Sequence, residues 1–162
     1  MNTSTSAAIE LDECTNAALQ QTLDYWQQLR GQRRMPARKD LDPADIPRLL
    51  PKLMLADVAL GAADGDAGDA PPQIRFRLVG TEVVGRFGYE MTGYRLSEID
   101  YGAQADEIAD LYRKAVVCGR PQFARLEIKQ GHDRLLRMQQ LLLPLSDDGT
   151  SVNMILAVVH CQ

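Results

Sequence analysis

FRLVGTEVVGRFGYEMTG, residues Phe76 to Gly93, joins the end of a strand-like run to four closely spaced glycines. Glycine adopts backbone angles that other residues avoid, so such a cluster is typical of sharp turns, close packing or phosphate-binding loops. A P-loop requires lysine and then serine or threonine after its second glycine, whereas Arg86 and Phe87 follow Gly85. A dinucleotide-binding motif requires a glycine where Glu82 stands. The stretch therefore favours a chain turn over a nucleotide site.

The length of 162 residues suits one compact domain with a substantial core and is too short for two ordinary domains. No uninterrupted apolar stretch is long enough to cross a bilayer. The first residues, MNTSTSAAIELDE, are polar and then acidic, unlike a secretory signal. We therefore expect a flexible N-terminus over residues 1–11, a single domain over residues 12–162, no membrane partner and a cytoplasmic location.

The charge is acidic overall but basic in one run. A net charge of -4 argues against a nucleic-acid-binding surface. The run RGQRRMPARK, residues 30–39, favours a solvated helix end over contact with nucleic acid. Cys14, Cys118 and Cys161 are widely separated and odd in number, which is typical of reduced thiols that pack in the interior. We expect no nucleic-acid partner and no disulfide framework.

Residues 12–30 show a helical pattern, because their apolar side chains recur at spacings of three and four. The stripe consists of Leu19, Leu23, Trp26 and Leu29. This amphipathic helix should stop at Gly31. Beyond the basic run, Asp42 and Pro43 predict one short helical turn, since aspartate caps helices and proline fits the first helical position.

Two strand-like runs flank a Gly/Ala/Asp/Pro stretch. KLMLADVAL, residues 52–60, is apolar on both faces, which is typical of a strand covered on both sides. The stretch at 61–73 predicts a surface loop, and its aspartates do not fit a calcium loop. QIRFRLVG, residues 73–80, alternates between apolar and polar side chains. The alternation predicts one face with Ile74, Phe76 and Leu78 and the other with Arg75, Arg77 and Val79.

The second half of the chain begins with glycine-broken helical turns between Thr81 and Tyr101. ADEIADLYRKAVVCG, residues 105–119, predicts a longer helix that Gly119 closes. Three strand-like runs follow, separated by turns that predict antiparallel hairpins. These runs cover residues 122–129, 134–145 and 152–161. The last is apolar on both faces and should lie at the centre of the sheet.

Together these runs predict an α+β fold, a five-stranded antiparallel sheet with helices on one face and an N-terminal amphipathic helix. Three stretches resemble a bacterial group of small PAS-domain proteins. They are the opening glycine stretch, GYEMTGYRLSEI at residues 88–99 and PLSDDGTSVNMILAVV at residues 144–159. The resemblance covers residues 23–159. It implies a PAS-like fold in which the glycines serve as backbone hinges, a sensory role in signal transduction, and dimer assembly through flanking helices.

PAS-like domains often keep a cavity between sheet and helices, so small-molecule binding is the default hypothesis. The ligand-binding candidates are Arg77, Tyr112 and Met138. For Arg77 we favour an ion pair with Asp57 on the neighbouring strand over recognition of a ligand carboxylate. Tyr112 and Met138 fit a cavity wall and the core equally well.

Cofactor, metal and enzyme functions lack their motifs. The PAS resemblance implies two cofactor types to look for, haem and a photoactive flavin. The long helix carries neither a histidine that could bind haem nor the NCRFLQ-like motif of photoactive flavin domains. His132 and His160 are too isolated for a metal pair. No local Ser/His/Asp or Cys/His set suggests catalytic residues. We expect no cofactor, metal site or enzyme activity; a ligand-free dimerisation or interaction module and a small enzyme are the alternatives to a ligand sensor.

The stripe of residues Leu19, Leu23, Trp26 and Leu29 is the apolar surface left without an assigned partner. It can pack on its own sheet, on a second subunit or on both. A two-fold interface can be built from one self-complementary stripe, and the PAS resemblance implies assembly through flanking helices. We therefore predict a homodimer with these four residues in the contact, and keep a monomer with intramolecular cover as the alternative.

Overall fold

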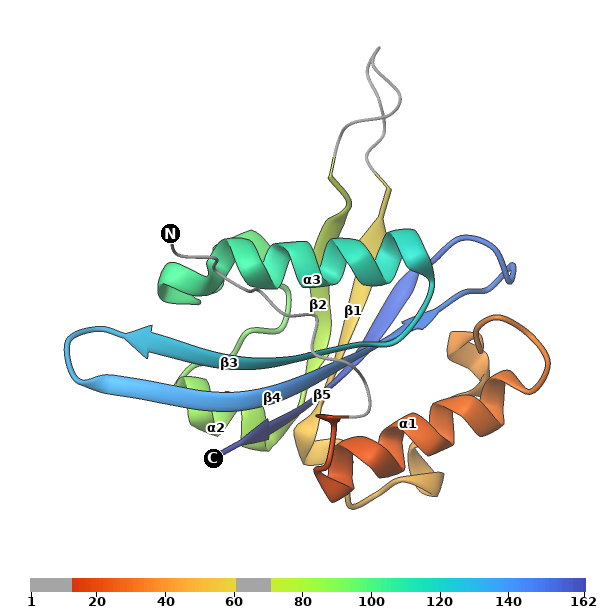
Figure 1. Ribbon diagram of the computed structural model, residues 1–162, viewed down its shortest axis with the longest axis horizontal. Coiled ribbons are helices and arrows are strands. Elements are labelled where there is room, and N and C mark those ends of the chain that lie inside the picture. Colours follow the sequence, from red (N-terminus) through yellow and green to blue (C-terminus); the bar gives the residue numbers. More distant parts are fainter. Residues whose placement is uncertain (1–12, 61–70) are drawn as a thin grey trace, which may run out of the picture.

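The computed structural model describes residues 13–60 and 71–162. The N-terminus predicted at 1–11 and the aspartates at 64, 66 and 69 lie outside the described residues. The described strands form one antiparallel sheet in the order β2-β1-β5-β4-β3, with β5 in the predicted central place (Figure 1). The strands are β1 (Leu53–Ala59), β2 (Gln73–Val79), β3 (Gln122–Gln130), β4 (Arg134–Leu145) and β5 (Met154–Cys161). The predicted α+β fold with a five-stranded antiparallel sheet is confirmed.

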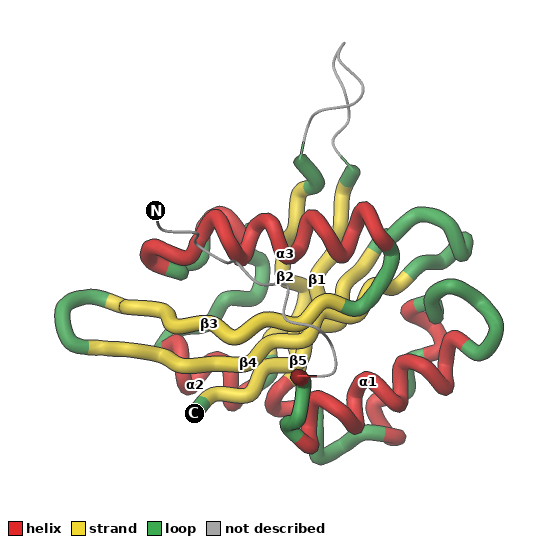
Figure 2. The backbone as a smooth tube through the Cα atoms, viewed as in Figure 1, coloured by secondary structure: helices red, strands yellow, loops and turns green. Residues whose placement is uncertain are grey.

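Helices cover both faces of this sheet, as Figure 2 shows. The α-helices of the described residues are α1 (Ala17–Arg30), α2 (Thr81–Phe87) and α3 (Ala105–Cys118). Short 3-10 turns are η2 (Arg38–Asp40), η3 (Pro43–Asp45), η4 (Leu50–Lys52), η5 (Leu96–Glu98) and η6 (Gly102–Gln104). We call the face under α2 and α3 the inner face, and the face under α1 the outer face. The sheet is therefore buried on both sides, which explains why β5 is apolar throughout.

Helix α1 begins at Ala17 rather than close to residue 12, because Asn16 caps it. The Asn16 side-chain oxygen accepts hydrogen bonds from the backbone N–H groups of Ala18 at 3.0 Å and Leu19 at 3.2 Å. An N-cap residue lies outside the helical backbone conformation, so α1 does not extend through Asn16. The helix ends as predicted at Gly31, whose φ of 57° suits glycine.

The predicted faces of β2 are wrong beyond Phe76, because the strand contains a bulge. Leu55 pairs with Leu78 while the next residue of β1, Ala56, pairs with Phe76, so Arg77 has no opposite residue. An extra residue in one strand shifts the alternation of side chains by one position. Val79 is therefore buried, and 51% of Leu78 is exposed.

The opening glycines serve the packing of α2 against the sheet. A Cβ atom at Gly80 would lie 2.3 Å from the carbonyl oxygen of Pro51, and Gly80 N–H donates to the Leu53 carbonyl at 2.7 Å. Gly88 ends α2 with a φ of 89°. At these two positions only glycine fits without strain, which confirms the expected turn and packing roles there. The expected role is wrong for Gly85, which lies within α2 and whose Cβ would meet nothing within 4 Å.

The basic run at 30–39 lies where two helices end. The Arg33 guanidinium donates to the Leu29 carbonyl at 2.7 Å, and the Arg34 guanidinium donates to the Cys118 carbonyl at 3.4 Å. The C-terminal end of a helix carries unpaired carbonyls and partial negative charge, so cations stabilise it. The predicted role at a helix end is confirmed for α1 and extends to α3.

Candidate ligand pocket

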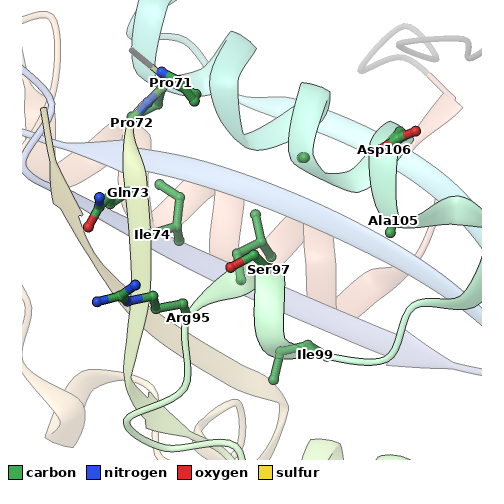
Figure 3. A pocket seen from close by; sticks show the side chains of 11 residues that line it. Pro71, Pro72, Gln73, Ile74, Arg95, Ser97, Ile99, Ala105 and Asp106 are labelled. Atoms are coloured by element: carbon green, nitrogen blue, oxygen red, sulfur yellow. The ribbon is translucent and has the colours of Figure 1, made fainter. Parts of the chain in front are cut away.

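A hollow of about 500 Å³ lies along the seam between β2, η5 and the start of α3 (Figure 3). It forms because the chain after α2 pairs only briefly with β2: Phe76 N–H donates to the Tyr94 carbonyl at 2.9 Å, and the chain then turns away into η5. The lining residues are Pro71, Pro72, Gln73, Ile74, Arg95, Leu96, Ser97, Ile99, Ala105, Asp106 and Ala109.

A second hollow of about 140 Å³ extends this space inward. It shares Pro71, Pro72, Ile74, Leu96 and Ala109 with the first and adds Asp110, Tyr112 and Arg113. We call the two together the seam pocket. We call the Tyr112 end of the pocket its inner end, because Tyr112 is fully buried. We call the end at the exposed ion pair of Arg113 and Asp110 (3.1 Å) its rim.

The pocket wall is apolar inside and charged at its edge. Figure 3 shows Ile74 from β2 and Ser97 from η5 on either side of the hollow, with Ala105 and Asp106 on α3 further along. The Arg95 side chain is exposed and extends toward β2. This arrangement suits a ligand whose apolar part lies inside while polar groups face the rim, as is common in small-molecule sites.

A buried polar pair lies behind the inner end of the pocket. Gln140 on β4 is only 1% exposed, and its side-chain N–H donates to the Tyr112 hydroxyl oxygen at 3.2 Å. The other amide atom, Oε1, is buried and has no hydrogen-bond partner among the described residues. The ring of Phe76 packs edge-on against the ring of Tyr112, with 6.3 Å between the ring centroids. Burial raises the pKa of Tyr112 far above its usual range, so the phenol stays neutral.

The predicted ligand residues do not come together. Arg77 is exposed and forms the ion pair with Asp57 that the sequence predicted, with Nε and Oδ2 3.0 Å apart. Tyr112 lines the seam pocket, whereas Met138 is buried and borders a separate hollow of about 360 Å³ beside Gln162. The predicted ion pair is confirmed, and a ligand role for these three residues stays a prediction.

Sequence reasoning missed Gln140, although the run RMQQLLLPL carried a signal. Gln139 and Gln140 are neighbours in a strand that is otherwise almost wholly apolar, and adjacent residues of a strand face opposite sides. When both faces of a sheet are covered, at least one of two adjacent polar residues points into the interior. The missed Ser97 has no such signal, because it lies in a short turn.

The α1 stripe packs within the chain at two of its four positions. Leu19 is fully buried, and Trp26 is 3% exposed with its indole N–H donating to the Pro144 carbonyl at 2.8 Å. Leu23 and Leu29 are only partly buried. The burial of Leu19 and Trp26 fits the intramolecular alternative at these positions, and the homodimer stays a prediction.

Groups suited to metal binding or to nucleophilic attack are sparse in the described part of the chain. Within residues 13–60 and 71–162, no cluster of three or more His, Cys, Asp or Glu side chains could hold a metal ion. Burial raises the pKa of the Cys14 and Cys161 thiols, which disfavours the reactive thiolate. No helix among the described residues has both the length and the apolar character needed to cross a membrane.

A solved PAS domain shares the fold of this chain. The PAS domain of BvgS from Bordetella pertussis aligns with a TM-score of 0.50 and 15% identity, over 88% of this chain and 87% of that one. A LOV protein from Rhodobacter sphaeroides aligns with a TM-score of 0.46 and 18% identity, over 75% of this chain and 68% of that one. No curated protein matches the sequence.

A family model described as PAS domain matches residues 14–159, nearly the whole chain. The match begins before α1 and ends within β5, so it spans both faces of the sheet and the seam pocket. The chain therefore belongs to the PAS domain family.

Proposed function

We propose that this chain is a sensory module that binds a small molecule in the seam pocket and passes the signal to a partner protein or second subunit. PAS domains are generally sensory or signalling modules. The observation that supports ligand binding here is the hollow of about 500 Å³ with its inward extension to Tyr112. Its volume lies within the range of pockets that hold small molecules.

Binding suits the pocket better than catalysis. Ser97 and Tyr112 supply its hydroxyl groups, and neither a histidine nor a cysteine lines it. A serine nucleophile needs an adjacent base within hydrogen-bond reach, and Ser97 has no hydrogen bond to such a group among the described residues. PAS folds are typically sensory rather than catalytic, which agrees with this lining.

Native mass spectrometry of gently purified full-length protein tests the proposal. We expect a bound small molecule in the wild type and its loss from Ala109→Trp, because Ala109 lines both hollows of the seam pocket. Val117→Trp is the matched control, since Val117 lies on the same helix, is 74% exposed and does not line the pocket. A ligand that Ala109→Trp retains would place the binding site elsewhere.

A second candidate function is contact with a partner through the outer face. An apolar groove of about 90 Å³ lies between β1, β2, β5 and the segment before β1. It is lined by Arg38, Leu41, Asp42, Pro43, Ile46, Leu50, Leu53, Leu55, Leu78 and Leu156. Leu78 and Leu50 are 51% and 36% exposed, and exposed apolar surface of this kind favours protein contact.

Sedimentation at tens of micromolar, about the range in which specific dimers persist, tests the homodimer. We expect a wild-type dimer that Leu78→Glu converts to a folded monomer if the groove forms the contact. Leu135→Glu is the control, because Leu135 is 43% exposed and lies on β4 outside the groove. A folded wild-type monomer would contradict the dimer. Trp26 is unsuitable for this test, because its substitution would also remove core packing.

A further inference from the structure

Gln140 is an unusual residue for its position. It lies in the middle of β4, paired with Ala124 of β3 and Val159 of β5 on the inner face of the sheet. Its amide N–H reaches Tyr112, but Oε1 accepts no hydrogen bond from any described residue. A buried acceptor without a donor costs stability, because it has lost its hydrogen bonds to water.

Reversing the amide does not remove this cost. If the oxygen and nitrogen exchanged places, the oxygen would accept the Tyr112 hydroxyl proton and the nitrogen would be left unpaired. In either orientation at least one buried amide atom of Gln140 is left without a hydrogen-bond partner among the described residues. Methionine has nearly the same size and shape as glutamine and would fill the space without an unpaired polar atom. Stability alone therefore does not account for Gln140, and losses of this kind are typical of functional sites.

Tyr112 connects this amide to the seam pocket. Tyr112 lines the pocket, and its hydroxyl oxygen accepts a hydrogen bond from the Gln140 side chain behind it. A molecule in the pocket would therefore reach Gln140 Oε1 once the Tyr112 ring moved aside. The surroundings are apolar, with Ile74 and Leu96 in the wall and Phe76 against the ring. The charged groups Arg95, Asp106 and Arg113 belong to the rim.

We propose that Gln140 selects the ligand of the seam pocket by accepting a hydrogen bond from a ligand hydroxyl group. The ligand class is a small, neutral and largely apolar molecule with a hydroxyl at its inner end. A hydroxyl both donates and accepts, so it can partner the free amide atom of Gln140 in either orientation. An ionised ligand end does not fit beside Tyr112 and Gln140, because both side chains are neutral and the charged Asp110 and Arg113 are exposed and paired with each other. This inference rests on the proposed function and adds the chemical class.

Phenol and toluene are matched probes for this inference, because they share a ring and differ in the hydroxyl. Titration followed by NMR of the full-length protein reports binding of each probe at the seam residues. We expect phenol to bind wild type roughly tenfold more tightly than toluene, the effect of one good hydrogen bond. Gln140→Met should lose this preference, with weaker phenol binding and unchanged or tighter toluene binding.

Gln139→Met is the control. Gln139 also has a buried, unpaired Oε1 among the described residues, but it faces the opposite side of the sheet from Gln140. Its substitution should leave the phenol preference intact. Equal binding of phenol and toluene to the wild type would overturn the role of Gln140 but not the proposal that the seam pocket binds small molecules. Failure of both probes to bind at the seam residues would overturn the pocket and with it this inference.

Stability without any probe provides the independent readout. Gln140→Met should unfold at a higher denaturant concentration than the wild type, because it removes the unpaired acceptor. A Gln140→Met protein that is folded but less stable than the wild type would show that Oε1 already has a partner, such as a buried water. That result would overturn the proposal whatever the probes do.

Discussion

The two faces of the sheet are both buried, but they are covered in different ways. The inner face lies under α3 and contains a buried polar pair, Tyr112 and Gln140, next to the seam pocket. The outer face lies under α1, which Trp26 fixes to β4, and leaves an apolar groove beside Leu78. Polar atoms in a core favour recognition of a specific ligand, whereas an exposed apolar groove favours contact with a protein. The proposed input and output surfaces therefore lie on opposite sides of one layer of strands.

This separation places alternate residues of the same strand on different surfaces. In β4, Gln140 belongs to the inner face and its neighbour Gln139 to the outer face. A shift of β4 caused by a ligand on one side must move side chains on the other, because a packed sheet has little free space. The comparison can be tested by substituting residues of each face separately and comparing the losses of stability and of probe binding.

The largest effect is expected at the outer face. Trp26→Ala should lower the free energy of unfolding by about 3–5 kcal/mol, because a buried indole and its hydrogen bond to Pro144 are lost. Chemical denaturation measures the loss, and Leu29→Ala, a partly buried position on the same helix, should lose much less. A loss that disappears on dilution would show that Trp26 packs against a second subunit rather than its own sheet.

The next effect concerns the packing of α2 on the inner face. Gly80→Ala should cost about 1–3 kcal/mol, because the new Cβ would lie 2.3 Å and 2.6 Å from the carbonyl oxygens of Pro51 and Leu50. Gly85→Ala is the matched control within α2, since a Cβ there meets nothing within 4 Å. This control should gain up to about 1 kcal/mol from helix propensity. Equal behaviour of the two variants in thermal unfolding would contradict the close approach at Gly80.

The buried tyrosines of the inner face predict a pH dependence. Burial raises the pKa of Tyr101 and Tyr112 above the ordinary value of 10.0. A group whose folded pKa is raised contributes its full stability below the unfolded pKa and loses it as pH rises. Stability should therefore fall above about pH 10, and ultraviolet absorbance should show tyrosinate appearing with unfolding. Tyr112→Phe should weaken this fall, whereas Tyr94→Phe at an exposed position should not.

The smallest effect is expected at Arg77. Its ion pair with Asp57 is solvent-exposed, and exposed pairs of this kind contribute at most about 1 kcal/mol. Arg77→Ala should therefore change thermal stability little and leave probe binding at the seam pocket unchanged. A large loss of stability would mean that Arg77 fixes the β2 bulge. A loss of probe binding alone would restore Arg77 as a ligand residue.

Local patterns in the sequence determined the order of the elements, the central place of β5 and the role of Gly80 and Gly88 in packing and turning the chain. The Arg77–Asp57 ion pair was also predictable, because the two residues lie on neighbouring strands. These features depend on periodicity and turn chemistry, which act over a few residues.

Only the tertiary structure decided the side of Leu78, the burial of Trp26 and the site behind Tyr112. A bulge depends on how two strands pair, so alternation within β2 alone did not reveal it. The stripe on α1 showed that a partner surface was needed, but not that Pro144, 118 residues away, supplied it. The seam pocket joins β2, η5 and α3, and Gln140 on β4 contacts its lining residue Tyr112. Residues so far apart in sequence become neighbours only through long-range packing, which local patterns do not contain.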